Sequence, residues 1–182
     1  MGSGTTLVEA KLLNRNAIGV DINPQSVSIS ETNLQFQCET KSKIHTRCAN
    51  ATDLSFIKDS HIDFICTHPP YANIIKYSKN VGGDISLLTV EEFLKEMTVV
   101  AQEAYRVLRK GKACAVMIGD MRRYGKVVPL GFWVMECFLS VGFVSKEIII
   151  KEQHNCRSTD YWEKQNNNFL LLAHEYIFVF QK

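Results

Sequence analysis

Stretches typical of strands and of helices alternate along almost the whole chain, and this alternation restricts the fold more than any other feature. Short apolar runs such as "AIGVDI" (17–22) and "IDFICT" (62–67) predict buried strands, and amphipathic segments between such runs predict helices. Strands separated by helices form parallel sheets with right-handed crossovers. The sequence therefore predicts a doubly wound α/β fold, with a mostly parallel sheet, in a single domain of residues 1–182.

Local signals fix the individual elements. Asn23 before Pro24, and Thr89 three residues before Glu92, are typical starts of helices. Gly111 is positioned to end the helix that begins after Thr89. The last two predicted strands are joined only by a polar loop and are expected to pair antiparallel. The remaining predicted strands cover 43–49, 113–119, 145–152 and part of 169–180, and the remaining helices cover 5–14 and 130–141.

A glycine loop opens the chain. In "MGSGTT", Gly2 and Gly4 lead into the first predicted helix, and such glycines let backbone N–H groups approach a ligand. Asp21 ends the next strand, where nucleotide-binding sheets hold ribose hydroxyls. A phosphate site is disfavoured, because no Gly-Lys-Ser/Thr is present and Leu7 replaces the third glycine of a dinucleotide fold. The pattern favours an adenosine ligand without pyrophosphate, such as S-adenosylmethionine; the alternative is a turn that only starts the helix.

A proline-rich loop, "THPPYAN" (67–73), ends a core strand abruptly, since two prolines neither continue a ladder nor open a helix. Ligands of doubly wound sheets bind beyond such strand ends, so Tyr71 is placed to stack on a flat base. Neutral His68 and the carbonyl of Pro69 are suited to accept the two hydrogens of an exocyclic base amine, while Pro70 keeps the loop rigid. On stacking alone, Tyr71→Phe is expected to keep most activity. The alternative is a rigid turn with a packed tyrosine.

The stretches "GSGTTLVEAKLLNRNAIGVDINP" and "THPPYANIIKYS" together resemble the motifs of the S-adenosylmethionine-dependent amino-methyltransferases of DNA, the cytosine-N4 and adenine-N6 group. The resemblance covers nearly the whole chain. It implies a Rossmann-like class I methyltransferase fold, S-adenosylmethionine as cofactor, and double-stranded DNA with a flipped base as substrate. The cofactor residues that it implies are Gly2, Ser3 and Gly4 around the methionine part, Asp21 on the ribose and Asn50 at the adenine amine, with Thr5 as a further cofactor residue. The catalytic loop that it implies is His68, Pro69, Pro70 and Tyr71.

Two departures from the family pattern change the expectations. The first catalytic position is Asp, Asn or Ser in the family and His68 here, which leaves the methylated base open; Thr67 resembles the cytosine-N4 members and slightly favours cytosine. Family members also carry a strand just before the glycine loop, located in the sheet between the strands corresponding to 17–22 and 62–67. We therefore expect a gap, or a direct but poorly supported contact, at the sheet centre, and marginal stability and weak cofactor binding of the isolated chain. Activity should need completion of the sheet by an upstream segment or a second polypeptide.

Candidate substrate residues follow the later strands. Asp120 and Arg122 come after the predicted strand 113–119, where they are candidates for contact with a phosphate or a base. Arg157 lies in a polar segment with an adjacent tyrosine and tryptophan, suited to charge and stacking contacts with nucleic acid, and Asn73 follows the proline-rich loop. Ordinary surface charges and a hairpin loop are the corresponding alternatives.

Composition limits the remaining function classes. A formal charge of +2 is compatible with a polyanionic partner. The cysteines show no C-x-x-C spacing and make no ligand pattern with the histidines, so neither a disulfide framework nor a metal site is expected. The absence of a signal peptide and of a long apolar run predicts a cytoplasmic protein without membrane contact. Two alternatives stay open: an RNA or tRNA guanine-amine methyltransferase, and a non-catalytic remnant or binding subunit.

Overall fold

The computed structural model describes residues 1–72, 81–153 and 170–182. Its helices are α1 (Thr5–Leu12), α2 (Pro24–Asn33), the short 3-10 helix η1 (Ile85–Leu87), α3 (Val90–Val107) and α4 (Leu130–Val141). Its strands are β1 (Ala17–Asp21), β2 (Ile44–Cys48), β3 (Ile62–Thr67), β4 (Leu108–Ile118), β5 (Met121–Arg123), β6 (Lys126–Val128), β7 (Val144–Glu152) and β8 (His174–Gln181). The predicted alternation of helices and strands is confirmed, and the short β5–β6 hairpin is an addition to it.

Helix starts follow the local sequence. The side chain of Asn23 accepts a hydrogen bond from the N–H of Gln25, with Pro24 in the first turn of α2. Thr89 and Glu92 form a reciprocal capping box at the start of α3. These caps satisfy N–H groups that have no partner within the helix.

The end of α3 differs from the prediction. The helix ends at Val107 rather than near Gly111, because Leu108 already belongs to β4. Gly111 has a φ of 77°, and the register between β3 and β4 shifts in this region. Its N–H donates to the carbonyl of Lys182. Gly111 thus forms an irregular segment inside a strand instead of a helix terminus.

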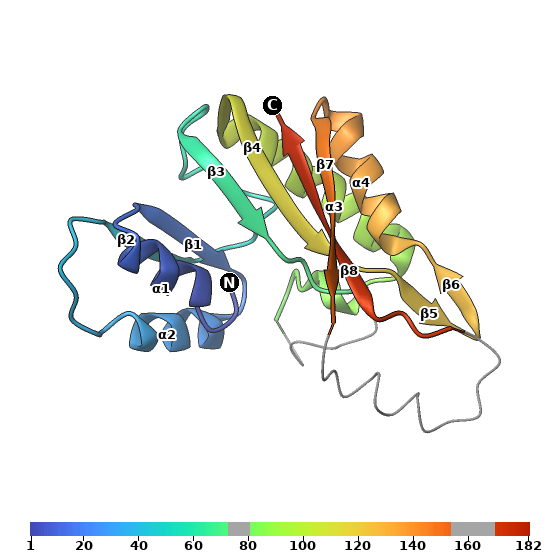
Figure 1. Ribbon diagram of the computed structural model, residues 1–182, viewed down its shortest axis with the longest axis horizontal. Coiled ribbons are helices and arrows are strands. Elements are labelled where there is room, and N and C mark those ends of the chain that lie inside the picture. Colours follow the sequence, from blue (N-terminus) through green and yellow to red (C-terminus); the bar gives the residue numbers. More distant parts are fainter. Residues whose placement is uncertain (73–80, 154–169) are drawn as a thin grey trace.

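The strands form two separate sheets in addition to the β5–β6 hairpin. β1 pairs with β2 in parallel, and a second sheet has the order β3-β4-β8-β7. In this second sheet, β3 and β4 are parallel, whereas β8 runs antiparallel to both β4 and β7, as predicted for the last two strands. Figure 1 shows the β1–β2 sheet, with α1 and α2, beside the larger sheet. Within the described residues no strand joins β1 to β3, so the predicted gap at the sheet centre is confirmed.

The main hydrophobic core lies between the larger sheet and the helix pair α3–α4. It is built from side chains that include Phe93 and Met97 of α3, Phe138 of α4, and Phe178 and Phe180 of β8, all almost fully buried. The rings of Phe138 and Phe180 stack with centroids 5.1 Å apart. By contrast, the buried apolar side chains of residues 1–48 are only Leu7 and Val27. The β1–β2 unit therefore has a much smaller core than the larger sheet.

Residues 49–61 connect the two sheets, and Arg106 of α3 holds this connection. Its guanidinium donates to the carbonyls of Leu54 and Ile57 and pairs with the carboxylate of Asp59. Glu103, one turn earlier, accepts from the N–H of Leu54. These contacts attach the connecting segment to α3, the helix that packs on the larger sheet. None of the helices in the described parts of the chain is long and apolar enough to cross a membrane.

Candidate active site

The glycine loop turns sharply before α1 and is held by α2. Gly4 has a φ of 82°, and a Cβ there would lie 2.8 Å from the side chain of Ser30, so only glycine fits without strain. Ser30 and Asn33 of α2 donate to the carbonyls of Gly2 and Ser3. A Cβ at Gly2 would meet no atom within 4 Å. The loop is therefore fixed from one side, while the space beside the Gly2 Cα is open to a ligand from the other.

Asp21 lies at the carboxyl end of β1, next to this loop. One carboxylate oxygen accepts from the Met1 ammonium at 2.8 Å and from the N–H of Gly2 at 3.2 Å. The other accepts from the N–H of Asn23 at 2.9 Å. Partial burial alone would raise the pKa of Asp21, but the hydrogen bonds from Met1, Asn23 and Gly2 outweigh it and lower the pKa. The site thus presents an ionised acceptor beside exposed hydroxyls of Ser3 and Thr5, which lie 3.3 Å apart.

A cavity of about 520 Å³ lies next to Asn50, in the loop after β2. Its other walls come from residues 81–85, Leu87, Leu88 and Glu96, and they combine apolar side chains with the carboxylates of Asp84 and Glu96. A Cβ at Gly83 would lie 3.1 Å from Ile22 and 3.2 Å from the amide nitrogen of Asn50, so this loop closes tightly over the residues after β1 and β2. The cavity falls within the usual size range of small-molecule sites. Apolar walls with one amide and two carboxylates suit a flat heterocycle that carries an amine.

The proline-rich loop follows β3 and is tied to β4 and β8 through Tyr71. The phenol accepts from the N–H of Gly119 at 2.8 Å and donates to Glu175 at 2.9 Å. Pro69 is buried, whereas the His68 side chain is 42% exposed, with its ring at right angles to that of Tyr71. In Figure 1, β1 and β3 run in the same direction, so the glycine loop and the proline-rich loop lie at corresponding ends of the two sheets.

The surroundings of His68 favour the neutral form of its imidazole. Partial burial lowers its pKa most, and the positive charges of Lys151 and Met1 lower it further, while Glu175 acts in the opposite direction. The net effect is a pKa below the ordinary value for histidine. A neutral imidazole has one nitrogen that is able to accept a hydrogen bond.

Of the four predicted substrate residues, the structure describes Asp120 and Arg122, and both make hydrogen bonds within the protein. Both carboxylate oxygens of Asp120 are used within the protein, accepting from the N–H of Gly131 at the start of α4 and from the phenol of Tyr176. Arg122 lies on β5, and its guanidinium donates to the carbonyls of Gly125 and Leu170. Asn73 and Arg157 lie outside the described residues.

Two parts of the site are not among the residues predicted from sequence. The first is the loop 81–88, whose adjacent Gly82 and Gly83 are its only sequence signal. The second is Glu175, a lone carboxylate at the start of the apolar stretch that forms β8. Within the described ranges, no three His, Cys, Asp or Glu side chains gather closely enough to hold a metal ion.

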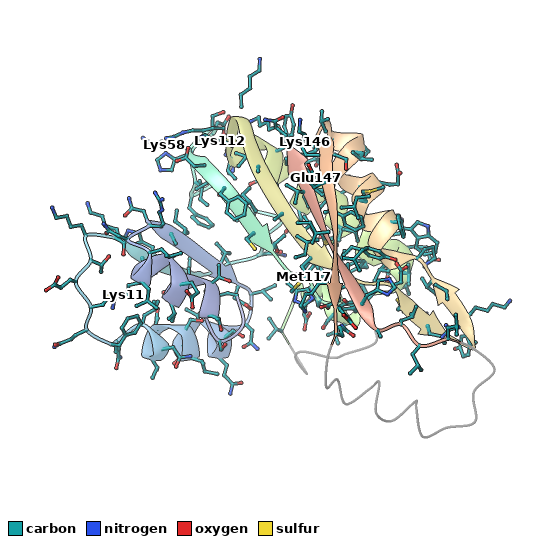
Figure 2. The ribbon with its side chains drawn as sticks, viewed as in Figure 1. Lys11, Lys58, Lys112, Met117, Lys146 and Glu147 are labelled. Carbon is teal, nitrogen blue, oxygen red and sulfur yellow. The ribbon has the colours of Figure 1, made fainter. Side chains whose placement is uncertain are left out.

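Most labelled lysines lie away from this site. Figure 2 shows Lys58, Lys112 and Lys146 at the end of the molecule where β3, β4 and β7 begin, whereas Met117 lies toward the other end of β4. The site at the strands' carboxyl ends is therefore on the opposite side from these lysines.

A family model described as DNA methylase, for N6 and N4 enzymes, matches residues 1–32 and 62–182. No curated protein matches the sequence. Among solved structures, an S-adenosylmethionine-dependent methyltransferase from Methanosarcina mazei is similar with a TM-score of 0.63 and 17% identity, covering 100% of this chain and 88% of that one.

Two DNA-modifying proteins are also structurally similar. A candidate DNA modification methylase from Thermus thermophilus, solved in complex with S-adenosyl-L-methionine, has a TM-score of 0.54 and 24% identity, with 74% of this chain and 53% of that one covered. The cytosine-N4-specific PvuII DNA methyltransferase has a TM-score of 0.59 and 17% identity, with 73% and 47% covered. The chain spans about half the length of these two proteins. The predicted class I methyltransferase fold is confirmed by these similarities.

Proposed function

Because the chain belongs to the DNA methylase family, whose model matches residues 1–32 and 62–182, we propose that it transfers a methyl group from S-adenosylmethionine to an exocyclic amine of a base in DNA. The observation that carries the proposal is the proline-rich loop, where a neutral imidazole, a prolyl carbonyl and an aromatic ring follow β3. Cytosine N4 is favoured over adenine N6, supported by Thr67 and by the structural similarity to a cytosine-N4-specific enzyme.

The cofactor would lie along the carboxyl ends of β1 and β2. Asp21 would accept hydrogen bonds from the ribose hydroxyls, which would replace the Met1 ammonium at its carboxylate. Gly2, Ser3, Gly4 and Thr5 would contact the methionine part, with the open backbone at Gly2 facing it. Asn50 would face the adenine amine in the cavity. When bound, S-adenosylmethionine supplies a methyl group on a cationic sulfur, which keeps the bonding electron pair as the methyl passes to the amine nitrogen.

The proline-rich loop would hold the target base. Tyr71 would stack on the ring of the flipped base. His68 and the carbonyl of Pro69 would each accept one hydrogen of the exocyclic amine. This arrangement draws the nitrogen lone pair out of the ring system, so that it becomes available to attack the methyl carbon. One amine proton then passes to water.

An assay with labelled S-adenosylmethionine tests this function. Residues 1–182 together with the segment that completes the sheet should transfer label to duplex DNA, whereas residues 1–182 alone should transfer little. Digestion of the labelled DNA should release N4-methyldeoxycytidine. Label in N6-methyldeoxyadenosine would contradict the choice of base. Label in tRNA but not in DNA would contradict the substrate class, and cofactor binding without transfer would favour a binding subunit.

The role of Asp21 gives a direct prediction for the cofactor. Asp21→Ala removes a charge-assisted acceptor of ribose hydroxyls, a loss of roughly 1.5–3 kcal/mol. The dissociation constant for S-adenosylmethionine, measured by calorimetry, should rise about ten- to a hundredfold. Glu9→Ala removes an equal charge from the exposed surface of α1 and should leave the affinity unchanged. Equal affinity of Asp21→Ala and the parent protein would exclude this role for Asp21.

DNA contact is proposed for the β5–β6 hairpin, which carries Arg122. Its turn residues Tyr124 and Gly125 both have positive φ, as in the tight turns that connect hairpin strands, and Tyr124 is 90% exposed. Arg123 lies over the Tyr124 ring, and Lys126 starts the return strand. A two-stranded ribbon with three positive charges is suited to contact DNA phosphates in a groove.

Removing two of these charges should weaken DNA binding and its salt dependence. For Arg122→Gln with Arg123→Gln, two lost phosphate contacts should reduce the slope of log affinity against log salt by about 1.8, from about 0.9 per contact. The matched control is Lys112→Gln with Lys146→Gln, which removes the same charge at the opposite end of the larger sheet (Figure 2). Similar slopes for both double variants, measured by fluorescence anisotropy, would argue against the hairpin as a DNA contact.

A further strand between β1 and β3 is also proposed, supplied by another segment or by a second polypeptide. In the described residues each of these strands has hydrogen-bonding partners on only one edge. Ile18 of β1 and Phe64 of β3 remain 38% and 58% exposed. A strand paired with both would satisfy open N–H and C=O groups and cover apolar surface.

A further inference from the structure

Glu175 forms the centre of a buried polar network behind the proline-rich loop. The residue is 5% exposed, and its carboxylate accepts from the Tyr71 phenol at 2.9 Å and from the Lys151 ammonium at 2.6 Å. Burial alone would raise the pKa of Glu175, but the hydrogen bonds from Lys151 and Tyr71 outweigh it and keep the carboxylate ionised. Burying a carboxylate costs free energy even when the charge is paired, so the position of Glu175 requires an explanation.

The phenol of Tyr71 is held on two sides. It accepts from the N–H of Gly119 at the end of β4 and donates to Glu175 on β8. A Cβ at Gly119 would lie 2.9 Å from the phenol oxygen, so glycine is required for this approach. The ring of Tyr71 is therefore oriented by its hydroxyl group, and stacking on a base would use a ring whose direction is already fixed.

The same carboxylate also faces His68. The Nε2 atom of His68 lies 3.4 Å from the Glu175 oxygen that Tyr71 contacts. A carboxylate beside Nε2 favours the tautomer that carries its proton there, which leaves the lone pair on Nδ1. The other charges that act on His68 are the Lys151 and Met1 ammonium groups, and both disfavour a second proton on the ring.

We propose that Glu175 is a positioning residue for methyl transfer: it fixes the ring of Tyr71 and orients His68 so that Nδ1 is the acceptor for the substrate amine. This proposal rests on the proposed function, since it assigns how the base-holding loop is arranged. Such fixed groups contribute to rate because reacting atoms must be held close to the reactive geometry.

Three variants test the proposal through activity. Tyr71→Phe keeps the aromatic ring but loses both hydrogen bonds of the phenol, so kcat should fall about tenfold or more. Glu175→Gln keeps the size of the side chain and should also lower kcat, while the affinity for S-adenosylmethionine changes less than about twofold in both variants. Tyr176→Phe, the control, removes a phenol of the same strand that contacts Asp120, and its kcat should match the parent. Full activity of Tyr71→Phe, as expected from stacking alone, would overturn the proposal.

A readout that does not depend on activity is the titration of His68 by NMR. Glu175 raises the pKa of His68, so Glu175→Gln should lower that pKa and move the acidic limb of the activity profile to lower pH. An unchanged His68 titration in Glu175→Gln would contradict the contact between the two residues. If the titration shifts while the parent protein transfers no methyl group to DNA, the arrangement of the loop is supported and the proposed function is wrong.

Discussion

Amide hydrogens of β1 and β2 are expected to exchange with solvent about a thousand times faster than those of β4 and β8. A thousandfold difference corresponds to about 4 kcal/mol in the free energy of opening. Within the described residues β1 pairs with β2 alone, and the buried apolar side chains of residues 1–48 are limited to Leu7 and Val27. β4 and β8 are inner strands of the larger sheet and contribute to its core. Opening the smaller unit therefore exposes little apolar surface.

Exchange measured by mass spectrometry at peptide resolution provides the test, with the chain of residues 1–182 alone. β7 is a useful internal control, because it belongs to the larger sheet but lies at its edge. It should be protected more than β1 and less than β8. Equal protection of β1 and β8 would mean that the two sheets unfold as one unit, and would remove the main argument for an additional strand between them.

A second large effect is expected in the main core. Phe178→Ala should lower the free energy of unfolding by about 3–5 kcal/mol, the usual loss when a large aromatic side chain is removed from a packed site. Phe178 is fully buried at the middle of β8, and its ring stacks on that of Tyr176 with centroids 5.3 Å apart. A cavity there would lie between the sheet and α4, with Phe132 on its border.

Urea denaturation measures this effect, and Phe64→Ala provides a control of the same residue type. Phe64 lies on β3 of the same sheet but is 58% exposed, so its loss should cost less than about 1 kcal/mol. Comparable losses for the two variants would show that Phe64 is covered by contacts absent from the described residues. A small loss for Phe178→Ala would contradict the assignment of the core.

Local signals were sufficient where the structure depends on neighbours in sequence. Asn23, Thr89 and Glu92 predict their helix starts because a cap acts within one turn. The prediction that Gly111 ends a helix was wrong, because the N–H of Gly111 bonds to the carbonyl of Lys182, which lies far away in the sequence. The gap between the sheets was predicted from the family resemblance, and no local pattern in this chain encodes it.

In the candidate site, too, features encoded by neighbours in sequence were predicted, and features that depend on distant contacts were not. Glycines, prolines and an aspartate at a strand end are recognisable because each restricts its own backbone or follows its own strand. Glu175 carries no such signal: its importance arises from the contact of β8 with a loop 104 positions earlier. The hydrogen bonds of the Tyr71 phenol likewise lead us to expect lower activity for Tyr71→Phe, whereas stacking alone predicts that most activity is kept.

The separation of the two sheets also divides the proposed reaction site between them. The groups proposed to hold the methyl donor are Asp21 at the end of β1 and Gly2 beside it, whereas His68 and Tyr71 lie in the loop after β3 of the larger sheet. The distance from donor carbon to acceptor nitrogen is therefore set by how two bodies are spaced, and a displacement of about 1 Å is enough to change a rate about a hundredfold. Any strand that binds in the intervening gap would set this distance, and its affinity would be thermodynamically linked to the affinity for S-adenosylmethionine.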